Sequence, residues 1–226
     1  MLDSVECIEK MRITLTQTDV MVEEFLYNGI VKSKFIRADD LIDCISFASR
    51  QDGIETGILP EGCIFYREEK DGMKYVAIKY INGIVDFVYN NAEFKNCPLP
   101  NMLFGFKVAM NGHIYTKMVS CFKGNKVRMD TKLCYYPFSN VYKNNHSICL
   151  GSNRLPMIDD IRQLESIPHY ILSLPNNDDM FCLEHNSRGL SYRDLLAELQ
   201  GKDEFDENLL VERPETVKDF IYTLKK

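Results

Sequence analysis

The sequence has no run of about 18 apolar residues, which is the length that a membrane-spanning helix needs. It also begins without the basic and apolar stretches of a secretory signal, so we expect a cytoplasmic protein with no membrane partner. Positive charge is scarce as well, because 27 lysines and arginines stand against 33 aspartates and glutamates. A net charge of −6 argues against a nucleic-acid partner, since the phosphate backbone attracts basic surfaces.

Cysteine is plentiful, but the spacings that mark metal sites are missing. None of the eight cysteines belongs to a Cys-x-x-Cys pair, and Cys182-x-x-His185 supplies only two of the roughly four ligands that zinc needs. The irregular spacing and the length of the chain also argue against a disulfide framework. We therefore expect no metal and no cofactor, and we expect most cysteines to be small buried hydrophobic residues.

The length of the chain fits one large domain or one domain with a smaller appendage. The chain has 226 residues, of which 45% are hydrophobic and 27% charged, as in ordinary globular proteins. We expect a hairpin and a helix over residues 1–58, packed on a core domain formed by residues 59–226.

The first half of the chain is typical of antiparallel strands. Residues 38–48 carry apolar side chains at helical spacing after an acidic start, which predicts one helix there. Asp71-Gly72 and Asn111-Gly112 are favoured hairpin turn pairs, and we expect residues 91–101 to form a loop. Alternating apolar residues predict strands at residues 12–16, 19–26, 63–68, 73–81, 84–89, 102–110, 113–122 and 127–136.

The second half changes character. Residues 137–156 are rich in Asn and Ser and predict a polar loop. The helical period of residues 157–174 is interrupted by Pro168, where we expect a kink or a break. Shorter helices are predicted at residues 192–199 and 217–224. A meander of strands followed by helices predicts the α+β class.

One segment of about 50 residues carries an ordered set of motifs. Asn140-Val141-Tyr142 is followed by Ile148-Cys149-Leu150, then by a predicted helix, and then by Pro175-Asn176-Asn177-Asp178-Asp179. This order resembles the catalytic segment of ubiquitin-conjugating enzymes. The chain looks most like their bacterial relatives of family D, a group that includes protein B of the PRTRC gene clusters. The resemblance implies an antiparallel β-meander flanked by helices, here with an N-terminal extension of strands and a helix.

The resemblance also implies a chemistry for these residues. Cys149 would take the C-terminal acyl group of a ubiquitin-like protein from a ThiF-type activating enzyme and pass it to a lysine or another nucleophile. Asn140 would donate its amide to the oxyanion, and Asp179, with Asp178 beside it, would orient and deprotonate the attacking amine. The chain would then be a cysteine-dependent acyl transferase in a bacterial conjugation pathway, in which a JAB peptidase also acts.

The segment departs from the family pattern at several positions. Phe138 and Ser139 stand where the family has His-Pro, Gly151 stands where it has Asp, and the turn at residues 144–146 is one residue longer. These departures keep a second hypothesis open, a non-catalytic relative that binds the modifier or its activating enzyme. A phage or plasmid assembly protein is a third.

Each of the implied roles also has a structural alternative. Cys149 could be a buried hydrophobic residue between Ile148 and Leu150. Asn140 could simply shape a turn, and the Asp178–Asp179 pair could belong to a solvated loop.

Overall fold

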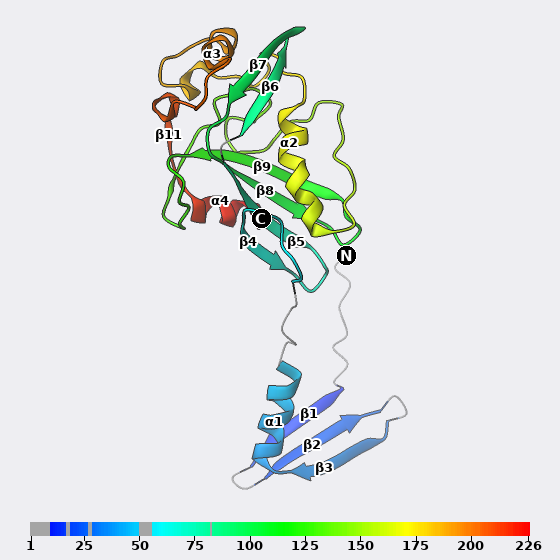
Figure 1. The fold of residues 1–226 in the computed structure, drawn as a ribbon. Helices are drawn as coiled ribbons and strands as arrows, with labels where there is room; N and C mark the ends of the chain where they lie inside the picture. The colour runs from blue at the N-terminus through cyan, green and yellow to red at the C-terminus, as the bar shows by residue number, and fades with distance from the viewer. Residues whose placement is uncertain (1–9, 17–18, 27–28, 50–55, 82) are drawn as a thin grey trace, which may run out of the picture. The chain divides into compact units, whose positions relative to one another are not determined.

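The computed structural model describes residues 10–16, 19–26, 29–49, 56–81 and 83–226 (Figure 1). Contacts divide the chain into two compact units, Met1–Thr56 and Gly57–Lys226. That the N-terminal residues pack on the rest of the chain stays a prediction.

The smaller unit contains an antiparallel sheet of order β1-β2-β3 and one helix. The predicted hairpin and helix are confirmed as β1 (Met11–Leu15), β2 (Val20–Phe25) and α1 (Ala38–Ser49). The sequence analysis missed β3 (Val31–Ile36), in which lysines interrupt the apolar residues. All six residues of β3 pair with β2, so strand pairing outweighs the weak hydrophobic signal of this segment.

The larger unit is built on an antiparallel sheet of order β11-β10-β9-β8-β5-β4. Its strands are β4 (Cys63–Glu68), β5 (Lys74–Tyr80), β8 (Met102–Val108), β9 (Ile114–Phe122), β10 (Lys132–Cys134) and β11 (Glu212–Thr216). Gly72 and Gly112 adopt φ values of 78° and 80° in the two predicted hairpin turns, which glycine does without strain. The α+β class and the antiparallel meander are therefore confirmed.

The prediction of a loop at residues 91–101 was wrong. Residues Ala92–Pro98 form β7, which pairs with β6 (Ile84–Tyr89) as a separate two-stranded hairpin. Asn90 and Asn91 both have left-handed backbone angles, with φ of 47° and 63°, as a tight two-residue hairpin turn requires. Two consecutive asparagines supply that turn without a glycine, which is why the hairpin escaped notice.

The edge of the large sheet that contains β10 and β11 differs from the prediction. The strand expected at residues 127–136 shrinks to Lys132–Cys134, and β11 pairs with it from the far end of the chain. The sequence did not predict β11 because it contains Pro214, and proline has no N–H to donate to the hydrogen bonds between strands. An edge strand tolerates it, and β11 lies at the edge.

The helices follow the predicted ranges closely. The break expected near Pro168 is confirmed as a change from the 3₁₀ helix η1 (Ile161–Ser166) to α2 (Ile167–Leu172), with the proline in the first turn of α2. Residues 192–199 and 217–224 are confirmed as α3 (Tyr192–Leu199) and α4 (Val217–Leu224). Two short 3₁₀ helices were not predicted, η2 (Leu183–His185) and η3 (Glu207–Leu209).

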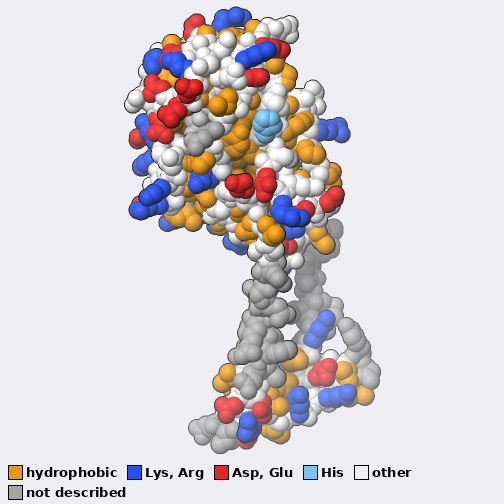
Figure 2. All heavy atoms as spheres, in the orientation of Figure 1, with side chains coloured by type: hydrophobic (Ala, Val, Ile, Leu, Met, Phe, Trp, Pro, Cys, Tyr) orange, Lys and Arg blue, Asp and Glu red, His pale blue; other side chains and the backbone are white. Residues whose placement is uncertain are grey.

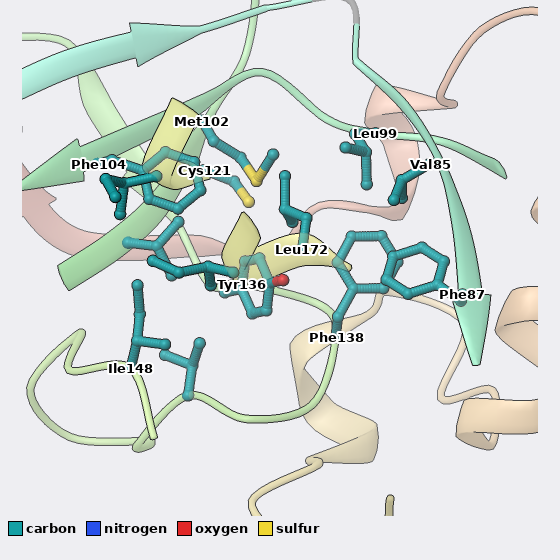
Figure 3. Packing of buried hydrophobic residues seen from close by; sticks show 14 of the residues in the cluster. Val85, Phe87, Leu99, Met102, Phe104, Cys121, Tyr136, Phe138, Ile148 and Leu172 are labelled. Atoms are coloured by element: carbon teal, nitrogen blue, oxygen red, sulfur yellow. The ribbon is translucent and has the colours of Figure 1, made fainter. Parts of the chain in front are cut away.

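Apolar side chains are buried on both faces of the large sheet. On one face α2, α3 and the β6–β7 hairpin form the cluster that includes Phe87 and Phe104 (Figure 3). On the other face α4 covers the sheet so closely that a Cβ on Gly105 would lie 2.9 Å from the Phe220 ring. The central strand β8 is therefore buried on both sides, as its run of apolar residues requires.

The surface of the larger unit mixes charges of both signs. On the face in Figure 2, acidic and basic side chains are interspersed with apolar ones. That face therefore offers no extended positive field to a phosphate backbone. Within the described residues, no helix has the length and apolar character needed to cross a membrane.

The turn between β8 and β9 gives the first prediction. Gly112 is buried, has a φ of 80°, and a Cβ there would collide with the Ile158 carbonyl. Gly112→Ala should therefore lower the free energy of unfolding by about 2–4 kcal/mol, from the left-handed backbone and the clash together. Gly124→Ala is the matched control, because Gly124 has a similar φ of 73° but open space around it. Equal losses for the two variants in urea unfolding would contradict this reading of Gly112.

Candidate functional site

Cys149 lies at the end of a short hairpin formed by residues 140–149. Its backbone N–H donates to the Asn140 carbonyl at 2.8 Å, and the Tyr142 N–H donates to the Ser147 carbonyl at 2.9 Å. Val141 and Ile148 form an antiparallel bridge between these two bonds. The predicted polar loop therefore contains an ordered hairpin that joins two of the predicted site residues through their backbones.

The extra residue of the 144–146 turn is accommodated at the tip of this hairpin. His146 adopts a left-handed φ of 61°, and Asn145 Oδ1 accepts the Ser147 N–H. Because the insertion is absorbed in the turn, the pairing of Asn140 with Cys149 is undisturbed.

The hairpin is held against strand β9. The Val119 N–H donates to the His146 carbonyl at 2.9 Å, and the Ile148 N–H donates to the Lys117 carbonyl at 3.0 Å. The other end of β9 pairs with β10, so the hairpin extends the sheet where β10 leaves it. The hydrogen bonds between the hairpin and β9 fix the position of Cys149 along this edge of the sheet.

The residues on either side of Cys149 differ in how deeply they are buried. Ile148 is buried and points into the core near Tyr136, whereas Cys149 and Leu150 are only half-buried (Figure 3). Cys149 lines a surface cleft of about 400 Å³, together with residues Tyr115, Thr116, Lys117, Tyr142, Ser147, Ile148, Leu150, Gly151 and Asn153. Gly151, with a φ of 57°, turns the chain away from β9 directly after the site. The thiol is therefore reachable from a cleft rather than enclosed in the core.

Among the other described thiols, those of Cys97, Cys121 and Cys134 are buried, whereas Cys63 and Cys182 are half-buried like Cys149. Burial raises the pKa of Cys63 and of Cys121, and it raises the pKa of Cys97 and Cys134 from 9.0 to about 11. Cys7 and the side chain of Cys44 lie outside the described part of the chain.

These differences predict an order of reactivity. A thiol pKa of about 11 in place of 9.0 reduces the thiolate fraction at neutral pH about 100-fold, and the thiolate is the reactive form. We expect limiting iodoacetamide to label Cys149 before Cys63, Cys97, Cys121 and Cys134, as read by peptide mapping. Labelling of Cys97 or Cys134 with Cys149 spared would contradict the accessible position of Cys149.

The Asn140 side chain points to the segment that leads into the acidic pair. Its Nδ2 donates to the Pro175 carbonyl and to Asn176 Oδ1, each at 3.2 Å. Asn140 itself has a left-handed φ of 66°, which asparagine tolerates better than most residues. Both amide hydrogens are thus engaged in bracing residues 175–176 in the structure as it stands.

Phe138 and Ser139 hold this region in a way that the sequence did not indicate. Phe138 is 1% exposed, and its ring lies 4.8 Å from that of Phe87 and 5.3 Å from that of Tyr136 (Figure 3). Ser139 Oγ donates to the Asp179 carbonyl at 3.0 Å. An aromatic anchor and a buried hydroxyl therefore stand where the family pattern has His-Pro.

Both aspartates of the acidic pair are exposed, and each has a neighbour that orients it. Tyr89 Oη donates to Asp178 Oδ1 at 2.7 Å, and this bond raises the pKa of Tyr89. Asn177 Nδ2 donates to Asp179 Oδ2 at 3.0 Å. The sequence analysis missed Tyr89, because it lies 89 residues from Asp178 and only the fold brings the two together.

His146 lies at the tip of the hairpin and is buried there. It is 3% exposed and contacts the Phe220 ring of α4, and its Nδ1 has no hydrogen-bond partner among the described residues. Burial, with the charge of Arg213 as a smaller cause, lowers its pKa from 6.5 to about 4. The imidazole is therefore neutral at neutral pH and supports the packing of α4 on the hairpin.

This burial predicts a pH dependence of stability. In the unfolded chain the imidazole of residue 146 becomes protonated below about pH 6.5. In the folded chain it becomes protonated only near pH 4. The free energy of unfolding should therefore fall by about 2 kcal/mol from pH 7 to pH 5 through this residue. His146→Asn keeps a residue that tolerates the left-handed backbone, and it should remove that part of the slope in urea unfolding. An unchanged slope would show that the imidazole is not buried in solution.

No group of three or more His, Cys, Asp or Glu side chains is placed to hold a metal ion within the described residues. Cys182 and His185, whose spacing alone resembles part of a zinc site, make other contacts. The Cys182 thiol faces Glu184 at 3.8 Å, and the His185 ring stacks on Tyr135 at 4.4 Å.

Comparison with known proteins adds one match to this geometry. The family model of prokaryotic E2 family D matches residues 40–170, which is more than half of the chain. The matched range includes Phe138, Asn140 and Cys149 and ends before the acidic pair at residues 178–179. No curated protein and no solved structure gives a significant match to the chain.

Proposed function

The chain belongs to prokaryotic E2 family D, and on that premise we propose that it carries a ubiquitin-like modifier as a thioester on Cys149. It then passes the modifier to a nucleophile in a bacterial conjugation pathway. One arrangement carries the proposal: the hairpin pairs Cys149 with Asn140, and Asn140 in turn braces the segment that leads to Asp179. Hydrogen bonds thus link the hairpin that carries Cys149 and Asn140 to the distant segment that leads to Asp179, and Cys149 itself lines an open cleft.

The reaction has two acyl transfers. In the first, the Cys149 thiolate attacks the carbonyl carbon of the modifier's C-terminal thioester, the bond from that carbon to the activating enzyme's sulfur breaks, and the departing thiolate takes up a proton. In the second, an amine attacks the new thioester, the bond from carbon to Cys149 sulfur breaks, and the amine proton is lost to a base. Each transfer needs an accessible thiol, a donor for the tetrahedral oxyanion and, in the second, a base.

Asn140 is the proposed oxyanion donor. Losing such a donor typically slows an enzyme by about 10²–10³. Its two amide hydrogens are engaged with residues 175–176, so donation to an oxyanion requires that one of these bonds be given up. Asn140 would then hold the acidic segment in the resting state and serve the oxyanion during transfer.

Asp179 is the proposed base for the incoming amine, and Asp178 lies beside it. Both carboxylates are exposed, which leaves them open to an approaching lysine. A positioned base of this kind contributes about 10²–10⁴ to a rate. The bonds from Tyr89 and Asn177 limit the orientations of the two carboxylates, which favours a defined approach.

The proposed partners follow from the family. They are a ubiquitin-like protein and a ThiF-type activating enzyme, with a JAB peptidase in the same PRTRC-like pathway. We place the protein in the cytoplasm, where an ATP-dependent activating enzyme would work.

The thioester is tested with a short peptide α-thioester that ends in glycine, which needs no activating enzyme. We expect the peptide to be transferred to Cys149, as an adduct seen by mass spectrometry that hydroxylamine removes. Cys149→Ser should yield a more slowly cleaved ester or no adduct, and Cys149→Ala should yield none. Cys182→Ser is the matched control, because Cys182 is also half-buried, and it should load like the unaltered protein.

A binding module is the second candidate. The engaged Asn140 amide and the replacement of His-Pro by Phe138-Ser139 favour it. The test is repeated with a ubiquitin-like protein, a ThiF-type activating enzyme and ATP. Binding without an adduct on Cys149 would favour the module over the transferase.

A further inference from the structure

Ser139 occupies an unusual position between the two halves of the site. It is 1% exposed, and its Oγ lies 3.0 Å from the Asp179 carbonyl oxygen and 3.3 Å from Asn140 Oδ1. Asp179 is 40 residues further along the chain, so this hydroxyl joins two distant segments. A buried hydroxyl needs a partner, and here both oxygens within reach belong to proposed site residues.

We infer that Ser139 is a positioning residue that sets the acidic loop relative to the thioester on Cys149. The inference rests on the proposed function and assigns a role to a residue of this chain that replaces proline in the family pattern. Proline has no hydroxyl, so it cannot make the bond to the Asp179 carbonyl.

Hydrogen bonds through Asn140 and Ser139 connect the backbone of Cys149 with the backbone of Asp179. The Cys149 N–H donates to the Asn140 carbonyl, and the Asn140 amide donates to Pro175 and Asn176. The Ser139 hydroxyl then holds the backbone of Asp179 itself. Without that last bond the connection stops at residue 176, and residues 177–179 keep the Asn177 contacts and the Tyr89 bond to Asp178.

The surroundings of Ser139 leave little freedom for the hydroxyl. The preceding residue, Phe138, is anchored in the aromatic cluster with Phe87 and Tyr136, so the backbone of Ser139 cannot shift to follow the loop. Removing the oxygen should therefore release the acidic loop and leave the hairpin in place.

The experiment separates deprotonation of the amine from loading of the thiol. Cys149 is loaded with the same glycine-terminated peptide α-thioester, and the adduct is discharged either by lysine or by hydroxylamine. Hydroxylamine is already unprotonated at neutral pH and needs no base, whereas the lysine amine, with a pKa of about 10.4, does. Ser139→Ala should load normally and discharge to lysine about fivefold more slowly, the factor that one hydrogen bond is worth. Its discharge to hydroxylamine should be unchanged.

Three further variants sharpen the comparison. Ser120→Ala is the matched control, because Ser120 is equally buried and its Oγ donates to the Cys134 carbonyl at 2.9 Å, within the sheet. It should leave both discharge rates unchanged. Asp179→Ala should reproduce the selective loss with lysine, and Ser139→Thr, which keeps a hydroxyl, should restore most of the lysine rate.

The outcomes distinguish this inference from the function on which it rests. Equal slowing by Ser139→Ala with lysine and hydroxylamine, or an equal effect of Ser120→Ala, would overturn the positioning role and leave the thioester chemistry standing. Failure of the unaltered protein to form any adduct on Cys149 would instead overturn the proposed function, and this inference with it.

Discussion

The hydrogen bond from the Cys149 N–H to the Asn140 carbonyl, 2.8 Å long, closes the hairpin on which the site depends. This bond places Cys149 opposite Asn140, and the Asn140 side chain braces the segment that leads to the acidic pair. The hairpin in turn lies on β9 through the bonds to His146 and Ile148, so the geometry of the site is inherited from the sheet. A change that moved β9 would therefore move the thiol as well.

Packing on both faces of the sheet holds this arrangement in place. Ile148 anchors the hairpin in the core on one face, and His146 contacts Phe220 of α4 on the other. Ile148 and His146 thus pack into opposite layers. Cys149, next to Ile148, is left at the rim, where a reactive thiol can be half-buried and still meet a large partner.

The replacement of His-Pro shows how a site can keep its geometry with different residues. Phe138 secures the backbone by burial among aromatic rings, a contact that depends on area and shape rather than on a polar partner. Ser139 supplies the polar link to the acidic loop that proline cannot supply. The departures that raise the binding-module hypothesis are thus compatible with an ordered site.

Local patterns in the sequence determined much of this protein. Asp71-Gly72 and Asn111-Gly112 located two hairpins, helical spacing located α1 and the helical segment that contains α2, and the ordered motifs around Cys149 indicated the family. Other features depended on contacts between distant residues. The strand β11 contains Pro214 and exists because β10 offers it an edge, and Tyr89 meets Asp178 only across the folded core. Whether the Asn140 amide faces the thiol or the acidic segment was likewise decided by tertiary structure. Short-range propensity governs turns and helices, whereas the direction of a side chain follows from which distant groups the fold brings within hydrogen-bond reach.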